Sequence, residues 1–320
     1  MRILFAGALL CSLSLAGCDA LDTKEDLNLT DEMMATRRYQ MFDWGYRVYE
    51  HIPYGFTAID GNLFAAVSDE AQYVTTFSST QRFNEGSWSA YYNPDDCYTS
   101  YYNGIYAAHD YLDKSVDYRY ILGMHRDTLT SNGLDSYRRD IVDVQRLRAE
   151  AHVLKAYYYF ELLRHYGPFV VMDENIDPGV PVEDMKKERS PVDVCVEEIV
   201  SLLDEAMKDL PLMKDKERSR WAYHSLESAA ALKAMTLFYA ASPLFNGNPA
   251  YSGFVNSKGE KLFSQQKDPE KWRYAAEAVD SALLICNRGG KYLISSESDK
   301  ITDRIKDIEA SAIALNFENA

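Results

Sequence analysis

The sequence predicts an all-α protein, a tetratricopeptide-like helical-repeat superhelix with long irregular loop insertions. Apolar residues recur at steps of three and four in one segment after another, which is the period of an amphipathic helix. These segments follow one another as neighbouring pairs joined by turns of varying length. Because one such pair lacks enough apolar partner, stacking the pairs into a right-handed superhelix buries the remaining apolar faces. The repeat length is not constant, which favours large loop insertions over a regular array.

The first helix is expected to begin at Asp31, with Thr30 or Asp31 as its cap, and to fade near Pro53. The stretch 53–95 contains glycine, proline and short aromatic clusters without a sustained period. We interpret it as irregular loops with one short helix at 67–74.

Helices dominate the rest of the chain. They are predicted at 97–114, 136–166, 191–210, 224–241 and 269–287. Gly167 and Pro168 end the longest helix, and the next one is expected to have Ser190 as its cap and Pro191 at its first position.

Small and aromatic residues in these helices are interpreted as scaffold positions rather than ligand contacts. Alanine lets two helices approach closely, and aromatic rings fill the space between pairs. The alanines are Ala149, Ala151, Ala156, Ala231 and Ala234, and the rings are Tyr157, Tyr158 and Phe160. Tyrosines at helical spacing in the helix 97–114 are likewise predicted to pack in the core, namely Tyr98, Tyr101, Tyr102 and Tyr106.

The N-terminus has the layout of a secretory signal. Arg2 precedes an apolar run over residues 3–15 that is too short to span a bilayer. The sequence Leu-Ala-Gly-Cys that follows fits a lipobox and ends at Cys18. We therefore expect a signal peptide at 1–17, lipid attachment at Cys18 and an acidic tether at 18–30, the alternative being an ordinary secretory signal with an incidental cysteine. Several acyl chains on Cys18 would anchor the protein to a membrane face without crossing it.

Composition and motifs exclude several classes of protein. A formal net charge of -15 argues against a nucleic-acid partner, since phosphate binding needs clustered Lys and Arg. The cysteines Cys97, Cys195 and Cys286 are widely spaced and indicate buried free thiols rather than a disulfide framework or a zinc site. The chain contains no GxSxG, HExxH, P-loop or GxGxxG motif. We therefore expect no catalytic residues, no metal and no cofactor, and the chain is predicted not to be an enzyme.

Five further motifs occur in a set order. Residues 148–168 read RAEAHVLKAYYYFELLRHYGP, residues 231–247 contain ALKA and end in AASPLFNG, and DPEKW at 268–272 precedes AAEA at 275–278. Together with the lipobox, these motifs resemble the RagB/SusD family of nutrient-uptake outer-membrane lipoproteins. The resemblance covers residues 18–293.

The resemblance implies a tetratricopeptide-like scaffold and docking onto a TonB-dependent, SusC-like outer-membrane porin. It also implies capture of oligosaccharide, or of peptide in some branches, ahead of import. The acidic stretch after Cys18 resembles surface-export signals in this family, so the lipid-anchored protein is expected on the outer membrane, facing the cell exterior.

The chain departs from the family after residue 293. Residues 31–293 are assigned to the helical domain, with a ligand-loop region at 53–96, while 294–320 form a polar, divergent or truncated tail. Family members are longer, and their C-terminal part often supplies ligand contacts. We therefore expect that this chain holds the scaffold and only part of the ligand site.

Ligand contacts are expected in the irregular segments, because function concentrates on loops carried by a rigid scaffold. Trp88 is the first candidate, since it lies in a polar, turn-rich loop in which no helical period demands a buried indole. Sugar rings present apolar C–H faces that stack on aromatic rings. Tyr91 and Tyr92 are the next candidates, and Asn93 could bind sugar hydroxyls. The competing interpretation is that Trp88 attaches the loop to the core.

Two further loops supply candidates. Asn248 and Tyr251 follow Pro243 in a loop that could equally be a connector between helices, and Asn62 and Asp69 lie near the N-terminal helices. The predicted function is delivery of oligosaccharide to the transporter without bond chemistry. The alternatives are a peptide-binding member of the same family or a helical protein–protein adaptor, and a glycoside hydrolase is the least favoured.

Overall fold

Helices and turns make up the part of the chain that the computed structural model describes, namely residues 38–53, 64–75, 78–89, 91–93, 95–176 and 179–290. The α-helices are α3 (Arg38–Arg47), α4 (Ser79–Asn84), α5 (Tyr98–Lys114), α6 (Tyr118–Met124), α7 (Ser131–Tyr166), α8 (Val182–Met185), α9 (Val192–Ala206), α10 (Leu226–Ala241) and α11 (Glu270–Arg288). The 3-10 helices are η1 (Val48–His51), η2 (Phe64–Val67), η3 (Met213–Asp215), η4 (Arg218–Arg220) and η5 (Pro249–Tyr251). Strand pairing in these ranges is limited to two isolated bridges. The all-α prediction is confirmed.

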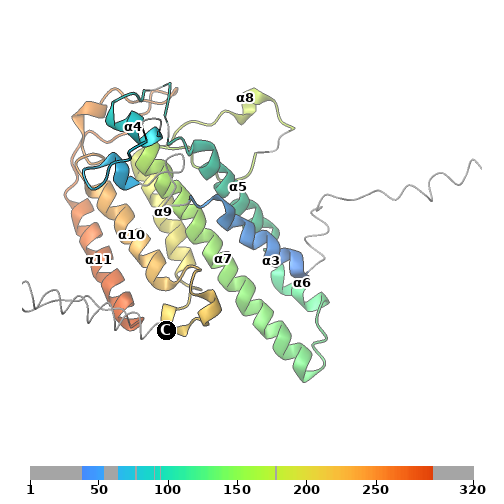
Figure 1. The fold of residues 1–320 in the computed structure, drawn as a ribbon. Helices are drawn as coiled ribbons and strands as arrows, with labels where there is room; N and C mark the ends of the chain where they lie inside the picture. The colour runs from blue at the N-terminus through green and yellow to red at the C-terminus, as the bar shows by residue number, and fades with distance from the viewer. Residues whose placement is uncertain are drawn as a thin grey trace, which may run out of the picture.

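The long helices pack in the order in which they occur in the chain (Figure 1). α5 packs on α7, α7 on α9, α9 on α10 and α10 on α11, while α3 and η1 lie against α5 and α7. α7 therefore lies in the middle, with helices on both sides. Its C-terminal half is buried on nearly every face, which is the pattern of a core helix rather than of a surface helix.

The predicted long helices agree with the observed ones to within a few residues, except at the start of α7. α7 begins earlier, at Ser131, because the Thr130 hydroxyl accepts a hydrogen bond from the Gly133 N–H (3.3 Å) and caps the helix. The prediction that Ser190 caps α9 is wrong, since Pro191 is the N-cap residue and no side chain caps this helix. The predicted start at Asp31 lies outside the described residues.

The short helix predicted at 67–74 is also wrong. Beyond η2 these residues form a turn and extended chain, and the helix of this region is α4. The Ser78 hydroxyl caps α4 by accepting a hydrogen bond from the Gln81 N–H (3.4 Å). A helix as short as α4 has too few turns to show a period, so only its cap could have indicated it. The equally short α6 was missed for the same reason.

Two scaffold residues are not buried as predicted. In α5, Tyr101 is buried and Tyr98 and Tyr102 pack against the core, but Tyr106 is 52% exposed. The buried face of α5 continues from Tyr101 at steps of four and three, through Ile105, Ala108 and Tyr111. Tyr106 is one position past Ile105 and therefore lies outside this face. In α10, Ala231 is exposed, whereas the other four predicted alanines are buried.

The cysteines of the described residues are free, as expected. Cys195 is buried, whereas Cys97 and Cys286 are only partly buried. Full burial was thus predicted correctly for one of them.

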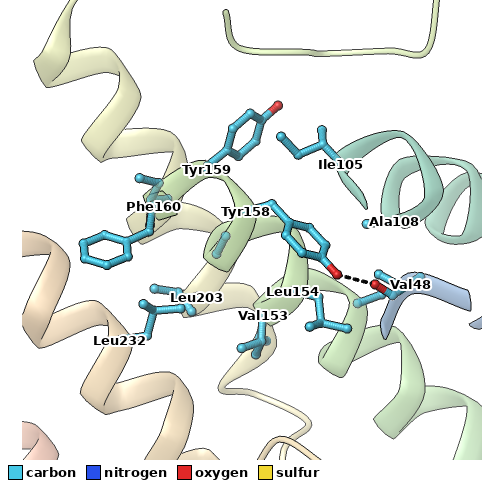
Figure 2. Packing of buried hydrophobic residues seen from close by; sticks show 14 of the residues in the cluster. Val48, Ile105, Ala108, Val153, Leu154, Tyr158, Tyr159, Phe160, Leu203 and Leu232 are labelled. Carbon is cyan, nitrogen blue, oxygen red and sulfur yellow. Dashed lines mark hydrogen bonds between the residues drawn. The ribbon is translucent and has the colours of Figure 1, made fainter. Parts of the chain in front are cut away.

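α5 and α7 touch at Gly104. A Cβ atom added to Gly104 would lie 2.5 Å from Cε2 of Tyr158, which is inside van der Waals contact. Tyr158 is fully buried among apolar side chains, and its hydroxyl donates a hydrogen bond to the Val48 carbonyl (2.5 Å), as Figure 2 shows. The missing side chain at Gly104 thus lets Tyr158 join α7 to both α5 and η1.

We expect Gly104→Ala to destabilise the protein by about 1–3 kcal/mol, because the added methyl group overpacks the contact with the Tyr158 ring. Urea unfolding followed by circular dichroism measures this change. Gly123→Ala in α6 is the matched control, since its Cβ would lie 3.8 Å from the nearest atom, in Tyr137. That variant should be neutral or stabilising by up to about 1 kcal/mol; equal destabilisation in both variants would contradict the assigned contact.

A buried polar cluster joins the first helices to the connector between α9 and α10. Glu150 of α7 is 2% exposed and accepts a hydrogen bond from the Tyr49 hydroxyl (2.9 Å). Lys216 is also buried, and its ammonium donates hydrogen bonds to the carbonyls of Tyr223 (2.5 Å) and His224 (3.0 Å). Burial raises the pKa of Glu150 to about 7, although the Tyr49 hydrogen bond and the charge of Lys216 act in the opposite direction.

The folded protein therefore holds the Glu150 proton more tightly than the unfolded chain does. Its contribution to stability is complete below the unfolded pKa of about 4.3 and is lost as the pH rises through about 7. Glu150→Gln can still accept the Tyr49 hydrogen bond but does not titrate. We expect its free energy of unfolding to vary less than that of the wild type between pH 4.5 and pH 7.5, and to be higher by about 1–3 kcal/mol above that range. Urea unfolding across this pH range measures the effect, and parallel curves for the two proteins would refute it.

Candidate ligand-binding site

An aromatic loop follows α4. Trp88 is 57% exposed, Tyr91 is fully exposed and Tyr92 is 39% exposed. The ring nearest to Trp88 is Phe83 of α4, at a centroid distance of 6.2 Å and a tilt of 41°. Trp88 therefore does not attach the loop to the core, and its indole face is open to solvent.

Local hydrogen bonds shape this loop. Ser89 and Tyr92 exchange backbone hydrogen bonds of 2.9 Å and 3.1 Å, which form a tight turn. Arg82 donates a hydrogen bond to the Tyr92 hydroxyl (2.6 Å), and its guanidinium lies 5.5 Å from the ring centroid. The Asn93 side chain accepts a hydrogen bond from the Asp95 N–H (3.0 Å). The aromatic rings are thus presented by a folded turn.

The base of the loop is attached to the C-terminal end of α7. The Tyr166 hydroxyl donates a hydrogen bond to Asp96 Oδ1 (2.7 Å) and accepts one from the Cys97 N–H (2.8 Å). His165 Nε2 lies 3.1 Å from Asp95 Oδ2, and this hydrogen bond raises the pKa of His165 above its ordinary value. Two adjacent side chains of one helix therefore fix the loop.

A cavity of about 270 Å³ opens at the same end of α7. The rings of Tyr251 and Phe263 lie 4.5 Å apart and those of Tyr251 and Phe254 5.3 Å apart, so one side of the cavity is aromatic. The complete lining is Leu163, Arg164, His165, Tyr166, Gly167, Pro168, Arg189, Leu244, Phe245, Tyr251, Phe254, Leu262 and Phe263. His165 and Tyr166 belong both to this cavity and to the attachment of the aromatic loop.

Of the two candidate residues in the second loop, one lines this cavity. Tyr251 lines it. Asn248 instead caps η5: its side chain accepts a hydrogen bond from the Ala250 N–H (3.0 Å) and donates one to the Leu244 carbonyl (3.2 Å). Asp69 is exposed in the turn after η2, and Asn84 joins that segment to α4 through the Ala66 carbonyl (3.0 Å).

Two predicted residues, Asn62 and Cys18, lie outside the described residues. Sequence reasoning also missed three polar groups at the cavity, Arg164, His165 and Arg189, because the first two belong to a motif that was assigned to the scaffold. For Arg164 and His165, the available signal was their position in the last turn of a long helix, just before Gly-Pro.

A second hollow lies between α9, α10 and α11. It consists of two adjoining cavities of about 450 Å³ and 420 Å³ that share Val200, Leu237 and Tyr274. Apolar and charged side chains alternate along it, and Lys233 and Lys271 are paired with Asp204 and Asp193. Its lining resembles an unfilled space between helices more than a polar ligand site.

In the ranges that the structure describes, no three His, Cys, Asp or Glu side chains gather as ligands for a metal ion. The same ranges contain no helix with both the length and the apolar character needed to cross a bilayer. The site therefore consists of aromatic rings, amides and paired charges.

The chain matches the SusD-like family described as "Starch-binding associating with outer membrane" over residues 19–239. It therefore belongs to the SusD-like family, whose non-catalytic members bind glycans for outer-membrane uptake systems. This confirms the resemblance inferred from the motifs and the prediction that the chain is not an enzyme. No curated protein matches the chain.

Solved structures share the fold. BT4246 is 24% identical in sequence with a TM-score of 0.60, and the match covers 81% of this chain and 41% of that one. A SusD homolog from Bacteroides thetaiotaomicron VPI-5482 is 18% identical with a TM-score of 0.52, covering 84% of this chain and 44% of that one. The tetratricopeptide-like fold is thus confirmed, and the chain spans about two fifths of the length of the structures it resembles.

The attachment of the aromatic loop can be tested through Tyr166. We expect Tyr166→Phe to lower stability by about 1 kcal/mol and to speed hydrogen exchange at the Cys97 amide, because both hydrogen bonds of this hydroxyl are lost. Tyr102→Phe is the matched control, since its hydroxyl accepts a hydrogen bond from the Val170 N–H (2.9 Å) instead. Each variant should speed exchange only at its own amide, and unchanged exchange at Cys97 in Tyr166→Phe would contradict the attachment.

Proposed function

We propose that this protein captures oligosaccharide at the C-terminal end of α7 and delivers it to a TonB-dependent, SusC-like transporter of the outer membrane. The protein makes and breaks no covalent bond of its ligand. The observation that carries the proposal is the exposed aromatic turn around Trp88, which is hydrogen-bonded to the same helix end that lines the aromatic cavity.

The chemistry of the site suits a carbohydrate. Trp88 and Tyr91 expose broad apolar rings that can stack on the C–H faces of sugars. Asn93 and Asp69 are exposed in turns and can bind hydroxyl groups. Arg164 and Arg189 at the cavity supply further hydrogen-bond donors. Stacking would provide affinity, and the polar groups would select among glycans.

The scaffold suits delivery rather than catalysis. The aromatic turn is held by backbone and side-chain hydrogen bonds to a buried helix, so binding requires little ordering of the protein. The family description, with its association with the outer membrane, agrees with a lipid anchor at Cys18 and a transporter partner. In that arrangement, closure of the transporter over the bound ligand would commit the ligand to import.

Affinity electrophoresis tests the proposal. Native gels are cast with soluble starch, as the family description suggests, and with a panel of other neutral and acidic polysaccharides, and the chain from residue 19 onward is run through them. We expect retarded migration on at least one polysaccharide. Trp88→Ala should weaken that binding about 30-fold, since an aromatic residue at the centre of a binding site contributes about 2 kcal/mol.

The control for this variant is Trp272→Ala, because Trp272 is a partly exposed indole that packs on Phe238 between α10 and α11 and does not line the cavity. It should bind like the wild type, and thermal melts establish that each protein is folded. Equal losses in both variants would remove Trp88 from the site. If the folded wild type binds no polysaccharide but is retarded by a peptide library, the peptide-binding alternative replaces the glycan. Release of reducing ends by the purified wild type would establish hydrolysis.

A further inference from the structure

α10 and α11 share an exposed apolar surface. Each helix carries one stripe of apolar side chains at steps of four and three that remains exposed, although the rest of the pair is largely packed. The stripe of α10 is Ala231, Met235 and Phe238, and the stripe of α11 is Trp272, Ala276, Val279 and Leu283. The larger side chains among these seven, which we name the outer face, are 38% to 51% exposed. Contiguous apolar exposure of this kind marks a contact surface.

The two stripes lie on the same side of the helix pair. At one end, the rings of Phe238 and Trp272 touch, with centroids 5.6 Å apart. At the other end, Gly289 approaches Glu227 so closely that a Cβ atom would overlap the carboxylate, so the two helices run antiparallel alongside each other. None of the outer-face residues lines the hollow between α9, α10 and α11. The outer face is therefore on the side of the pair that is turned away from α9.

α11 is the last helix of the row and packs mainly on α10 (Figure 1). In a helical-repeat protein, the terminal repeat has a polar outer side, because no further helix covers it. The outer face is apolar instead. In such arrays each helix pair buries its remaining apolar surface against the next repeat. The outer face is therefore where one more helix would pack.

The sequence that follows α11 contains a segment with a matching pattern. Residues 294–320 are polar in overall composition, but Ile301, Ile305, Ile308, Ala312 and Leu315 recur at steps of four, three, four and three. Most of the residues between them are polar or charged. This pattern predicts an amphipathic helix with one narrow apolar side. The stripe of α11 has the same steps from Trp272 to Leu283.

The connection is long enough for this segment to return along α11. α11 ends at Arg288, and Gly290 has a φ of +77°, a conformation that turns the chain out of a helix. The next ten residues, 291–300, can span about 16–19 Å as a flexible chain, whereas packed helices lie only about 8–10 Å apart. The segments 272–286 and 301–315 are equally long, about 21 Å each at 1.5 Å per residue.

We propose that residues 301–315 form a helix that packs antiparallel to α11 and covers the outer face. Its isoleucines would lie against Met235, Val279 and Leu283, and its charged residues would face solvent. The segment thereby acts as the capping helix of the array, which keeps the outer face from binding another protein. This inference concerns the end of the scaffold and does not rest on the proposed function.

Hydrogen exchange of the chain from residue 19 onward tests the proposal. We expect the amides of residues 305–315 to exchange at least about tenfold more slowly than in a free peptide of residues 295–320. Leu283→Asp should return exchange to the rate of the peptide, because it puts a charge into the outer face. Leu284→Asp is the matched control: Leu284 is 65% exposed and lies about 100° further around α11, so slow exchange should remain. Thermal melts establish that both variants are folded.

A second pair of variants changes only the segment itself. The reporter is Cys286, a free and partly buried thiol that lies three residues beyond Leu283 on the same side of α11. We expect Ile308→Asp to speed alkylation of Cys286 by about threefold or more, as followed by mass spectrometry of its peptide. Ile313→Asp is the matched control, because Ile313 lies about 140° around the predicted helix from Ile308 and its loss should leave the alkylation rate unchanged.

Fast exchange at residues 305–315 in the wild type would overturn the proposal. Slow exchange that persists in both Leu283→Asp and Ile308→Asp would overturn it too, since the segment would then be ordered elsewhere. A wild-type dimer in sedimentation that persists after deletion of residues 295–320 would assign the outer face to a second copy of the chain, with the same consequence. None of these outcomes involves a glycan, so failure of the proposed function is seen separately in affinity electrophoresis.

Discussion

The burial of the second half of α7 is the constraint on which the rest of the structure depends. Between Ala149 and Leu163 nearly every side chain is buried, so this helix can exist only if other helices cover it on all faces. α5 and α3 cover one side and α9 the other, and α10 and α11 extend the row from α9. The other long helices thus pack on α7 or extend the row that begins on it.

The buried charged residues in this stretch are tolerated because each has a partner. Glu150 accepts the Tyr49 hydroxyl, Lys155 lies between His109 (3.3 Å) and Glu198 (3.9 Å), and Glu161 is paired with Arg164 (2.6 Å). A buried charge without such a partner would cost several kcal/mol. The contacts of Glu150 and Lys155 also fix which neighbouring helix lies on which face of α7, since their partners come from η1, α5 and α9. Apolar packing provides the bulk of the stability, and the buried charges set the arrangement.

The long helices of the scaffold and the loop that contains Trp88 could both be predicted from the sequence, but opposite features indicated them. The long helices are visible because a strong period of three and four continues over several turns, as in 136–166. Trp88 stood out because it lies in a segment without any period. α4 and α6 were missed because six or seven residues are too few to show one, and Tyr106 was misplaced because one helical step decides between core and solvent.

The cavity at the end of α7 could not be predicted, because it is assembled from segments that are distant in sequence. The Ser190 N–H donates a hydrogen bond to the carbonyl of Phe169, which follows α7 (2.8 Å). The Val192 N–H donates one to the Leu262 carbonyl (2.9 Å). These two links bring residues 163–168, 189 and 244–263 to one place. No local sequence pattern indicates such pairing. The sequence therefore could not predict that Arg164 and Arg189 line the same cavity.

The Asp95 carboxylate has a consequence for the chemistry of Cys97. One of its oxygens contacts His165, and the other accepts a weak hydrogen bond from the Cys97 thiol (3.7 Å). Burial, and then the negative charge of Asp95, raise the pKa of this thiol. Because the thiolate is the reactive form, we expect Cys97 to react slowly with oxidants and alkylating reagents at neutral pH although it is only half buried. Its rate of alkylation should rise in any variant that loses the contact between Asp95 and the end of α7.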